Sequence, residues 1–203
     1  MYKKITDIIN SLDVTSIPKE RQALLNILVG YIQEKVSNKE EVRLNFICTH
    51  NSRRSHLSQV WAQTMAHYFQ INQVNCFSGG TEATALYPMV AKTLEQMGFQ
   101  ITKLSENKNP VYNIKFSENE SPIIGFSKTF DDAFNPESNF AAIMTCSQAD
   151  AGCPYIIGAE KRIPITYEDP KISDNTSKQT KVYTNRSLQI ATEMYYVFSQ
   201  IKK

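Results

Sequence analysis

Apolar residues recur along the chain with helical spacing in some stretches and as short strand-like runs in others. The clearest helical pattern covers residues 16–36, where the apolar positions are Leu24, Leu25, Leu28, Ile32 and Val36. Similar patterns predict helices over residues 1–12, 55–68, 88–96 and 181–201. Short apolar segments predict strands over residues 42–47, 74–77, 140–145 and 161–167, and a further pair over 111–116 and 122–126.

Strands that alternate with helices are typical of a parallel sheet with helices on both faces. The sequence therefore predicts an α/β domain over residues 41–203, preceded by a helical extension over residues 1–40. The last strand pair is joined by a polar turn, so we expect a β-hairpin inserted at about residues 104–139. Extension of a sheet edge, cover for a functional site and an oligomer contact all stay open as roles for this insertion.

Composition excludes several classes of function. The chain has 203 residues with 22 basic and 20 acidic side chains, and no long basic run, so we expect no nucleic-acid partner. No apolar stretch is long enough to span a membrane, and the N-terminus reads as a helix rather than a signal peptide, which predicts a cytoplasmic protein. The four cysteines are too few for a disulfide-stapled scaffold, and they do not have zinc-ligand spacing. We therefore expect neither a metal nor a cofactor.

Three chemically reactive side chains each follow a predicted strand. Cys48 follows the strand over 42–47, Cys146 follows that over 140–145, and Asp169 follows that over 161–167. Because ligands of such folds bind at the carboxyl ends of the strands, we expect the three residues at one edge of the sheet.

The segment CTHNSRRS, residues 48–55, joins a predicted strand to a predicted helix. Backbone amides in such a loop, together with the helix N-terminus, form a cradle for an anion. Arg54 can bind two oxygens of a tetrahedral oxyanion, and the same field favours the thiolate form of Cys48. Ser55 can donate a hydrogen bond to that thiolate. The alternative is that Cys48 is simply a buried cysteine, which the Cys-x5-Arg-Ser spacing makes the weaker interpretation.

The other positions of the segment have supporting roles in this interpretation. Thr49, Asn51 and Ser52 can hold the loop in shape through bonds between side chain and backbone. His50 is expected to support the backbone or to lie at the rim. Arg53 either adds a second cation beside the anion or points into solvent, and we favour solvent.

The chain resembles a known superfamily in this segment and in three others. CTHNSRRS resembles the phosphate-binding loop of the low-molecular-weight tyrosine phosphatase superfamily, and FSGGTEATALYPMVAKTLEQMGFQI is similar to a segment that follows this loop in the family. MTCSQADAGCP resembles the redox segment of thioredoxin-coupled arsenate reductases, which carries two cysteines separated by six residues, and YEDP resembles the Asp-Pro general-acid motif. The resemblance covers residues 42–102 and 140–201 and is closest to the reductases.

The resemblance implies a relay of three cysteines that reduces arsenate to arsenite. Cys48 would attack arsenic while Arg54 and the loop amides hold the oxygens, and Asp169 would protonate the departing hydroxide. Cys146 would then attack the sulfur of Cys48 and release arsenite, and Cys153 would move the disulfide to Cys146–Cys153. Thioredoxin would be the reductant.

Two other functions stay open at this point. Hydrolysis of phosphomonoesters through a phosphocysteine needs only Cys48, Arg54 and Asp169, because phosphate and arsenate share shape and charge. In a redox switch or oxyanion sensor without catalysis, Cys146 and Cys153 would form a disulfide but arsenate would not be turned over.

Overall fold

The computed structural model describes residues 1–152 and 155–203. Its elements in chain order are α1 (Lys3–Asn10), η1 (Val14–Ser16), α2 (Lys19–Ser37), β1 (Val42–Cys48), α3 (Arg54–Tyr68), β2 (Val74–Gly80), α4 (Pro88–Gln96), β3 (Gln100–Lys103), β4 (Tyr112–Lys115), β5 (Ile123–Gly125), β6 (Phe140–Met144), α5 (Ser147–Gly152), β7 (Ala159–Pro164), η2 (Pro170–Ser173) and α6 (Gln179–Ser199). Over these described ranges, the helices are all too short or too polar to cross a membrane.

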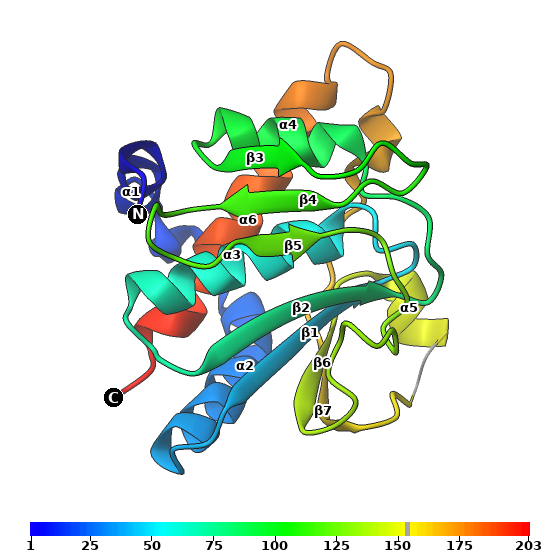
Figure 1. Ribbon diagram of the computed structural model, residues 1–203. Coiled ribbons are helices and arrows are strands. Elements are labelled where there is room, and N and C mark those ends of the chain that lie inside the picture. The colour runs from blue at the N-terminus through cyan, green and yellow to red at the C-terminus, as the bar shows by residue number, and fades with distance from the viewer. Residues whose placement is uncertain (153–154) are drawn as a thin grey trace.

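A four-stranded parallel sheet in the order β2-β1-β6-β7 forms the centre of the molecule. β1 pairs with β2 from Val42↔Val74 to Cys48↔Gly80, and with β6 up to Ile47↔Met144. All four strands therefore end at the same edge, where α5 also lies (Figure 1). This confirms the predicted α/β class.

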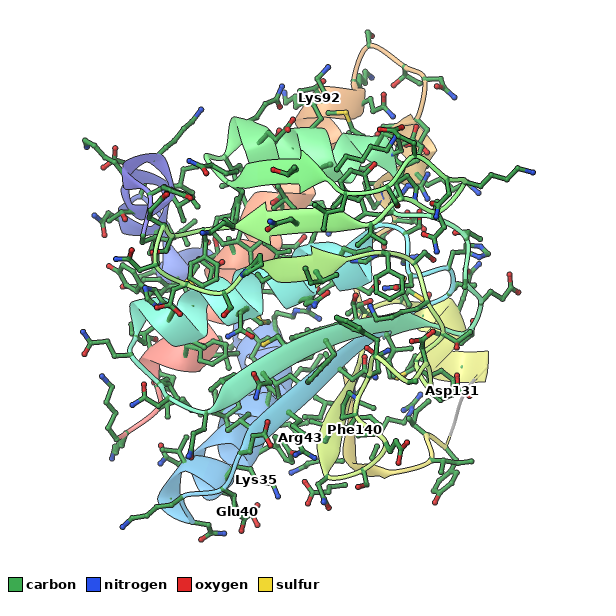
Figure 2. All side chains as sticks on the ribbon, in the orientation of Figure 1. Lys35, Glu40, Arg43, Lys92, Asp131 and Phe140 are labelled. Atoms are coloured by element: carbon green, nitrogen blue, oxygen red, sulfur yellow. The ribbon has the colours of Figure 1, made fainter. Side chains whose placement is uncertain are left out.

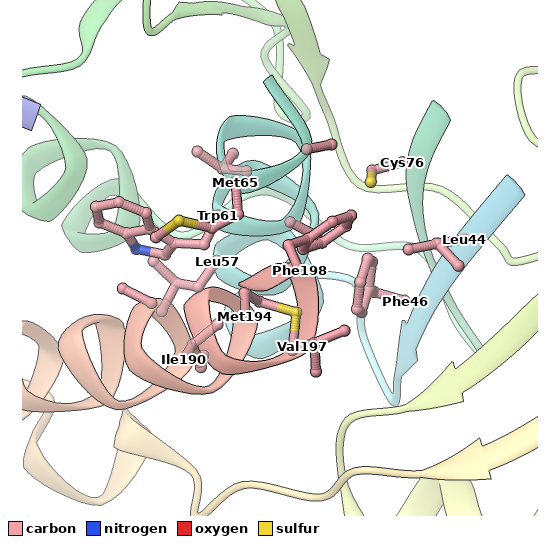
Figure 3. Packing of buried hydrophobic residues seen from close by; sticks show 14 of the residues in the cluster. Leu44, Phe46, Leu57, Trp61, Met65, Cys76, Ile190, Met194, Val197 and Phe198 are labelled. Carbon is pink, nitrogen blue, oxygen red and sulfur yellow. The ribbon is translucent and has the colours of Figure 1, made fainter. Parts of the chain in front are cut away.

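One face of the sheet packs against α2, α3 and α6. Figure 3 shows Trp61 and Met65 of α3 near Met194 of α6, with Phe46 of β1 beside Phe198. Burial of each large apolar side chain contributes about 1.5–3 kcal/mol to folding. The core therefore holds α3, which begins at the predicted loop, in a fixed position on the sheet.

The opposite face carries a smaller apolar cluster, which runs along β6 to the carboxyl ends of β1 and β6. Its buried members are Ile47, Cys48, Phe140, Ala142, Met144, Cys146, Ala149 and Ile156. The short helix α5 covers this cluster. Two cysteines that the sequence predicts as reactive thus share one small hydrophobic environment.

The predicted hairpin is present and belongs to a separate antiparallel sheet in the order β3-β4-β5. β3 has no counterpart among the predicted strands because three of its four residues are exposed, so it lacks the apolar signal of a strand. After β5 the chain reaches the main sheet, where Gly80 N–H donates to the carbonyl of Lys128 at 2.9 Å and Phe130 N–H donates to the carbonyl of Gly80 at 2.9 Å. The insertion therefore extends the edge of the main sheet beside the end of β2.

The N-terminal helices are fixed to the rest of the chain by a charged contact as well as by apolar packing. Arg21 of α2 donates two hydrogen bonds to Glu193 of α6, at 3.0 and 2.7 Å, and the Glu193 side chain is only 4% exposed. The same guanidinium lies 4.9 Å from the ring centre of Tyr167. This contact braces the segment that leads to Asp169.

The opposite end of the sheet carries surface ion pairs. Lys35 contacts Glu40 at 2.7 Å and Glu160 at 2.9 Å, and Arg43 contacts Glu41 at 2.5 Å. Figure 2 shows Lys35, Glu40 and Arg43 gathered near the start of β1, far from α5. Exposed pairs of this kind add little stability, so we assign them no role at the site.

Candidate active site

The loop after β1 places a thiol and a hydroxyl in direct contact. Cys48 is buried at the end of β1, and its Sγ lies 3.1 Å from Oγ of Ser55 in the first turn of α3. Nδ2 of Asn51 donates to the same Oγ at 2.9 Å. This leaves the Ser55 hydrogen free for the sulfur, which as a thiolate can only accept. The hydroxyl of Ser55 is therefore in position to donate a hydrogen bond to the sulfur of Cys48.

Close backbone contacts with neighbouring segments hold the loop in place. The carbonyl of Thr49 accepts a hydrogen bond from Glu82 N–H at 2.8 Å, and that of Ser52 accepts one from Tyr87 N–H at 3.0 Å. A Cβ on Gly80 would lie 2.7 Å from the Asn51 nitrogen and 2.8 Å from the Thr49 oxygen. Because Gly80 has no side chain, the end of β2 can lie close enough to the loop to support it, and no other residue fits at this position.

Asn51 has a left-handed conformation, with φ of 43°, which asparagine tolerates better than most residues. Its Oδ1 accepts a hydrogen bond from Lys128 N–H at 3.0 Å, which orients its Nδ2 toward Ser55. The insertion therefore sets the orientation of the amide that fixes Ser55, and through Ser55 the environment of Cys48.

Arg54 is buried, with 7% of its surface exposed, and the guanidinium edge at Nε lacks a hydrogen-bond partner among the described residues. Nη1 donates to the carbonyl of Tyr167 at 3.0 Å and Nη2 donates to Oδ2 of Asp169 at 2.6 Å. Nε has no partner within the ranges the structure describes. A buried donor left without a partner is costly, so this edge is suited to an oxyanion.

Cys146 lies beside the same loop and is completely buried. Its Sγ lies 3.4 Å from Oγ1 of Thr49 and accepts a hydrogen bond from Ala149 N–H at 3.3 Å. β1 and β6 are adjacent parallel strands paired up to Ile47↔Met144, so Cys48 and Cys146 both lie at the carboxyl ends of these strands and belong to one buried cluster. Cys153, the third predicted redox residue, lies outside the described residues.

His56 supports the loop from beneath. Its Nε2 lies 2.9 Å from the carbonyl of Asn51, which can only accept, so Nε2 carries the hydrogen and Nδ1 accepts from Ser78 Oγ at 3.2 Å. Burial lowers the pKa of His56 to about 3, and the charge of Lys128 acts in the same direction. The ring is therefore neutral throughout the physiological range.

This low pKa predicts that the protein loses stability in mild acid. The unfolded chain protonates His56 near pH 6.5 but the folded protein does so only near pH 3, so stability is full above pH 6.5 and falls below it. The contribution is about 1.4 kcal/mol per pH unit, or about 2 kcal/mol between pH 6.5 and pH 5. Urea unfolding at several pH values will show this loss in the wild type, and His56→Gln will lack it. His67→Gln, which replaces a more exposed ring, is the control. If the free energy of unfolding changes equally with pH in the wild type and in His56→Gln, the assignment is contradicted.

The structure places Arg53 and His50 outside the anion cradle. Arg53 does not point into solvent as expected, because its Nη2 donates to Asp174 and its Nε to Tyr183, both at 2.6 Å, and its side chain is only 11% exposed. Its guanidinium also lies 4.0 Å from the ring centre of Tyr87, so Arg53 links the loop to α6 through Tyr183 and to the start of α4 through Tyr87. His50 lies at the rim, 3.3 Å from Glu82.

Sequence reasoning missed two contributors to the site. Gly80 was readable in the glycine pair that ends β2, because such a pair often marks a close backbone approach. The burial of Lys128 could not be predicted, since a lysine in a polar, irregular segment is normally exposed to solvent.

Comparison with known proteins supports the fold alone. No model of a protein family and no curated protein matches the chain. Among solved structures, a low-molecular-weight phosphotyrosine phosphatase from Vibrio cholerae O395 is similar with a TM-score of 0.52 and 13% identity, over 78% of this chain and 94% of that one. A YwlE mutant from Bacillus subtilis has a TM-score of 0.51 and 15% identity, over 80% of this chain and 100% of that one. An arsenate reductase in the phosphate-binding state has a TM-score of 0.49 and 16% identity, over 79% and 99%.

Proposed function

We propose that this protein, whose fold is that of the low-molecular-weight phosphotyrosine phosphatases, reduces arsenate to arsenite through a thiol relay. The observation that carries the proposal is the position of Cys146, whose buried sulfur lies against the loop that begins at Cys48. Hydrolysis of a phosphomonoester has no use for a second thiol at this place.

The first step uses the loop as an anion site. Arsenate binds to the loop amides and to the free edge of Arg54, and the Cys48 thiolate forms a bond to arsenic. Asp169 donates its proton to the departing hydroxide, which leaves arsenic as water. Nη2 of Arg54, which donates to Asp169 in the structure, donates to the bound anion instead. The partly exposed carboxyl group of Asp169 is then free to transfer a proton.

The second step transfers two electrons to arsenic. The Cys146 thiolate attacks the sulfur of Cys48, and a disulfide bond forms as the bond between sulfur and arsenic breaks. The electron pair of that bond stays on arsenic, which leaves as arsenite. The Cys153 thiolate then attacks the sulfur of Cys146, so that a Cys146–Cys153 disulfide forms as the Cys48 thiolate leaves. A dithiol reductant of the thioredoxin class reduces this second disulfide, and its own two thiols become a disulfide.

The proposal is tested by coupling arsenate reduction to NADPH through thioredoxin and thioredoxin reductase. We expect steady turnover by the wild type and none above background for Cys153→Ser, which stops after one cycle. A known substrate of thioredoxin serves as the positive control for NADPH consumption. If this control consumes NADPH and the wild-type protein with arsenate does not, the proposal is contradicted.

Phosphomonoester hydrolysis is the second candidate. It is favoured by two contacts that do not involve Cys146: Ser55 lies against the Cys48 sulfur, and the next residue back along the chain, Arg54, contacts Asp169. Hydrolysis of an aryl phosphate that survives loss of Cys146 would identify this activity.

A further inference from the structure

Lys128, in the segment that joins the insertion to the main sheet, is buried without an ion-pair partner. Only 2% of its surface is exposed, and no carboxylate lies within ion-pair distance in the part of the chain that the structure describes. Its Nζ contacts the carbonyl of Phe126 at 3.5 Å and lies 4.5 and 5.3 Å from the ring centres of Phe126 and Phe134. An ammonium group in such a place opposes folding.

The backbone of Lys128 is fixed against the anion loop from two sides. Its N–H donates to Oδ1 of Asn51 at 3.0 Å, and its carbonyl accepts from Gly80 N–H at 2.9 Å. The preceding residue, Ser127, donates from Oγ to the carbonyl of His50 at 2.9 Å. The lysine therefore cannot move away from the loop without breaking the contacts that hold Asn51.

The charge of Lys128 acts on His56, a residue that contacts the loop. It lowers the pKa of His56, whose ring bonds directly to the Asn51 carbonyl. Burial lowers the pKa of Lys128 itself to about 8, against the opposing effect of Asp132, so most molecules keep the ammonium at pH 7. Because His56 is neutral, Lys128 supplies the positive charge on this side of the loop.

We propose that Lys128 is an electrostatic positioning residue, a buried cation through which the insertion strengthens the binding of doubly charged oxyanions in the loop Cys48–Ser55. This role rests on the proposed function only in requiring that the loop binds such an anion, whether arsenate or phosphate. It gives the insertion a function, because Lys128 belongs to the insertion and not to the parallel sheet or its helices. It also explains why a lysine is kept at a position where burial opposes folding.

The proposal predicts opposite changes in affinity and stability when the charge is removed. Lys128→Met keeps the length of the side chain but not the ammonium. We expect calorimetric affinity for tungstate and for inorganic phosphate to fall by at least about 5-fold, because a unit positive charge near a dianion is lost. The urea midpoint of the variant should rise, because an unpaired buried charge is gone.

Lys115→Met is the matched control, since Lys115 also lies in the insertion and its Nζ donates to a surface carbonyl, that of Glu118 at 2.8 Å. It removes the same net charge, and neither affinity nor midpoint should change by more than the error. Unchanged affinity in Lys128→Met would overturn the proposal. So would weaker binding with a lower urea midpoint or a failure to fold, because the lysine would then be structural. Wild-type protein that binds neither anion would overturn the proposed function itself, and the role of Lys128 with it.

Discussion

Cys48→Ser is expected to abolish arsenate reduction and any aryl phosphate hydrolysis, with a loss of at least about 10⁴-fold in turnover. The serine hydroxyl is not ionised at neutral pH, and the bonds from Ser55 and Asn51 that stabilise a thiolate do not make it a nucleophile. The measurement is turnover of both substrates under identical conditions, with circular dichroism to show that the variant is folded.

Cys76 provides the control for this result. It is also buried and is located on β2, and burial raises the pKa of its thiol well above the usual range. Cys76→Ala should therefore keep turnover within about two-fold of wild type, since no bond of the site involves its side chain. Loss of activity in Cys76→Ala equal to that in Cys48→Ser would contradict the assignment of the nucleophile.

Cys146→Ser is expected to separate the two activities. Arsenate reduction should fall to background, because an oxygen cannot replace the thiol that attacks the Cys48 sulfur. Aryl phosphate hydrolysis, if the protein has it, should stay within about three-fold of wild type, because serine is nearly isosteric and can keep the contacts with Thr49 and Ala149.

The measurement for this variant is arsenite released in a single turnover, compared with aryl phosphate hydrolysis by the same preparation. Equal losses of both activities would mean that Cys146 is structural. Retention of both would remove the relay from the mechanism.

Much of the site follows from the sequence because its parts are local. Cys48, Arg54 and Ser55 belong to one strand–loop–helix connection, and a thiol with an arginine at that spacing has few structural explanations. Asp169 and Cys146 were placed near them by a topological rule, since parallel strands end at one edge of the sheet. The structure joins Arg54 to Asp169 and Thr49 to Cys146 as that rule requires.

The parts that the sequence did not reveal depend on tertiary contacts. Arg53 is indistinguishable in sequence from a solvated arginine, and only the approach of α6 gives it Asp174 and Tyr183 as partners. Lys128 is buried because Phe126 and Phe134 close over it. β3 exists because β4 pairs with it, although its own residues carry no strand pattern.

A trapped disulfide tests the central claim most directly. Reduced Cys153→Ser protein is mixed with one equivalent of arsenate, quenched in acid, digested and mapped by mass spectrometry without reduction. The relay predicts a Cys48–Cys146 disulfide in proportion to the arsenite formed, and none when phosphate replaces arsenate. Arsenite formed without that disulfide, or no disulfide at all in protein that binds arsenate, would contradict it.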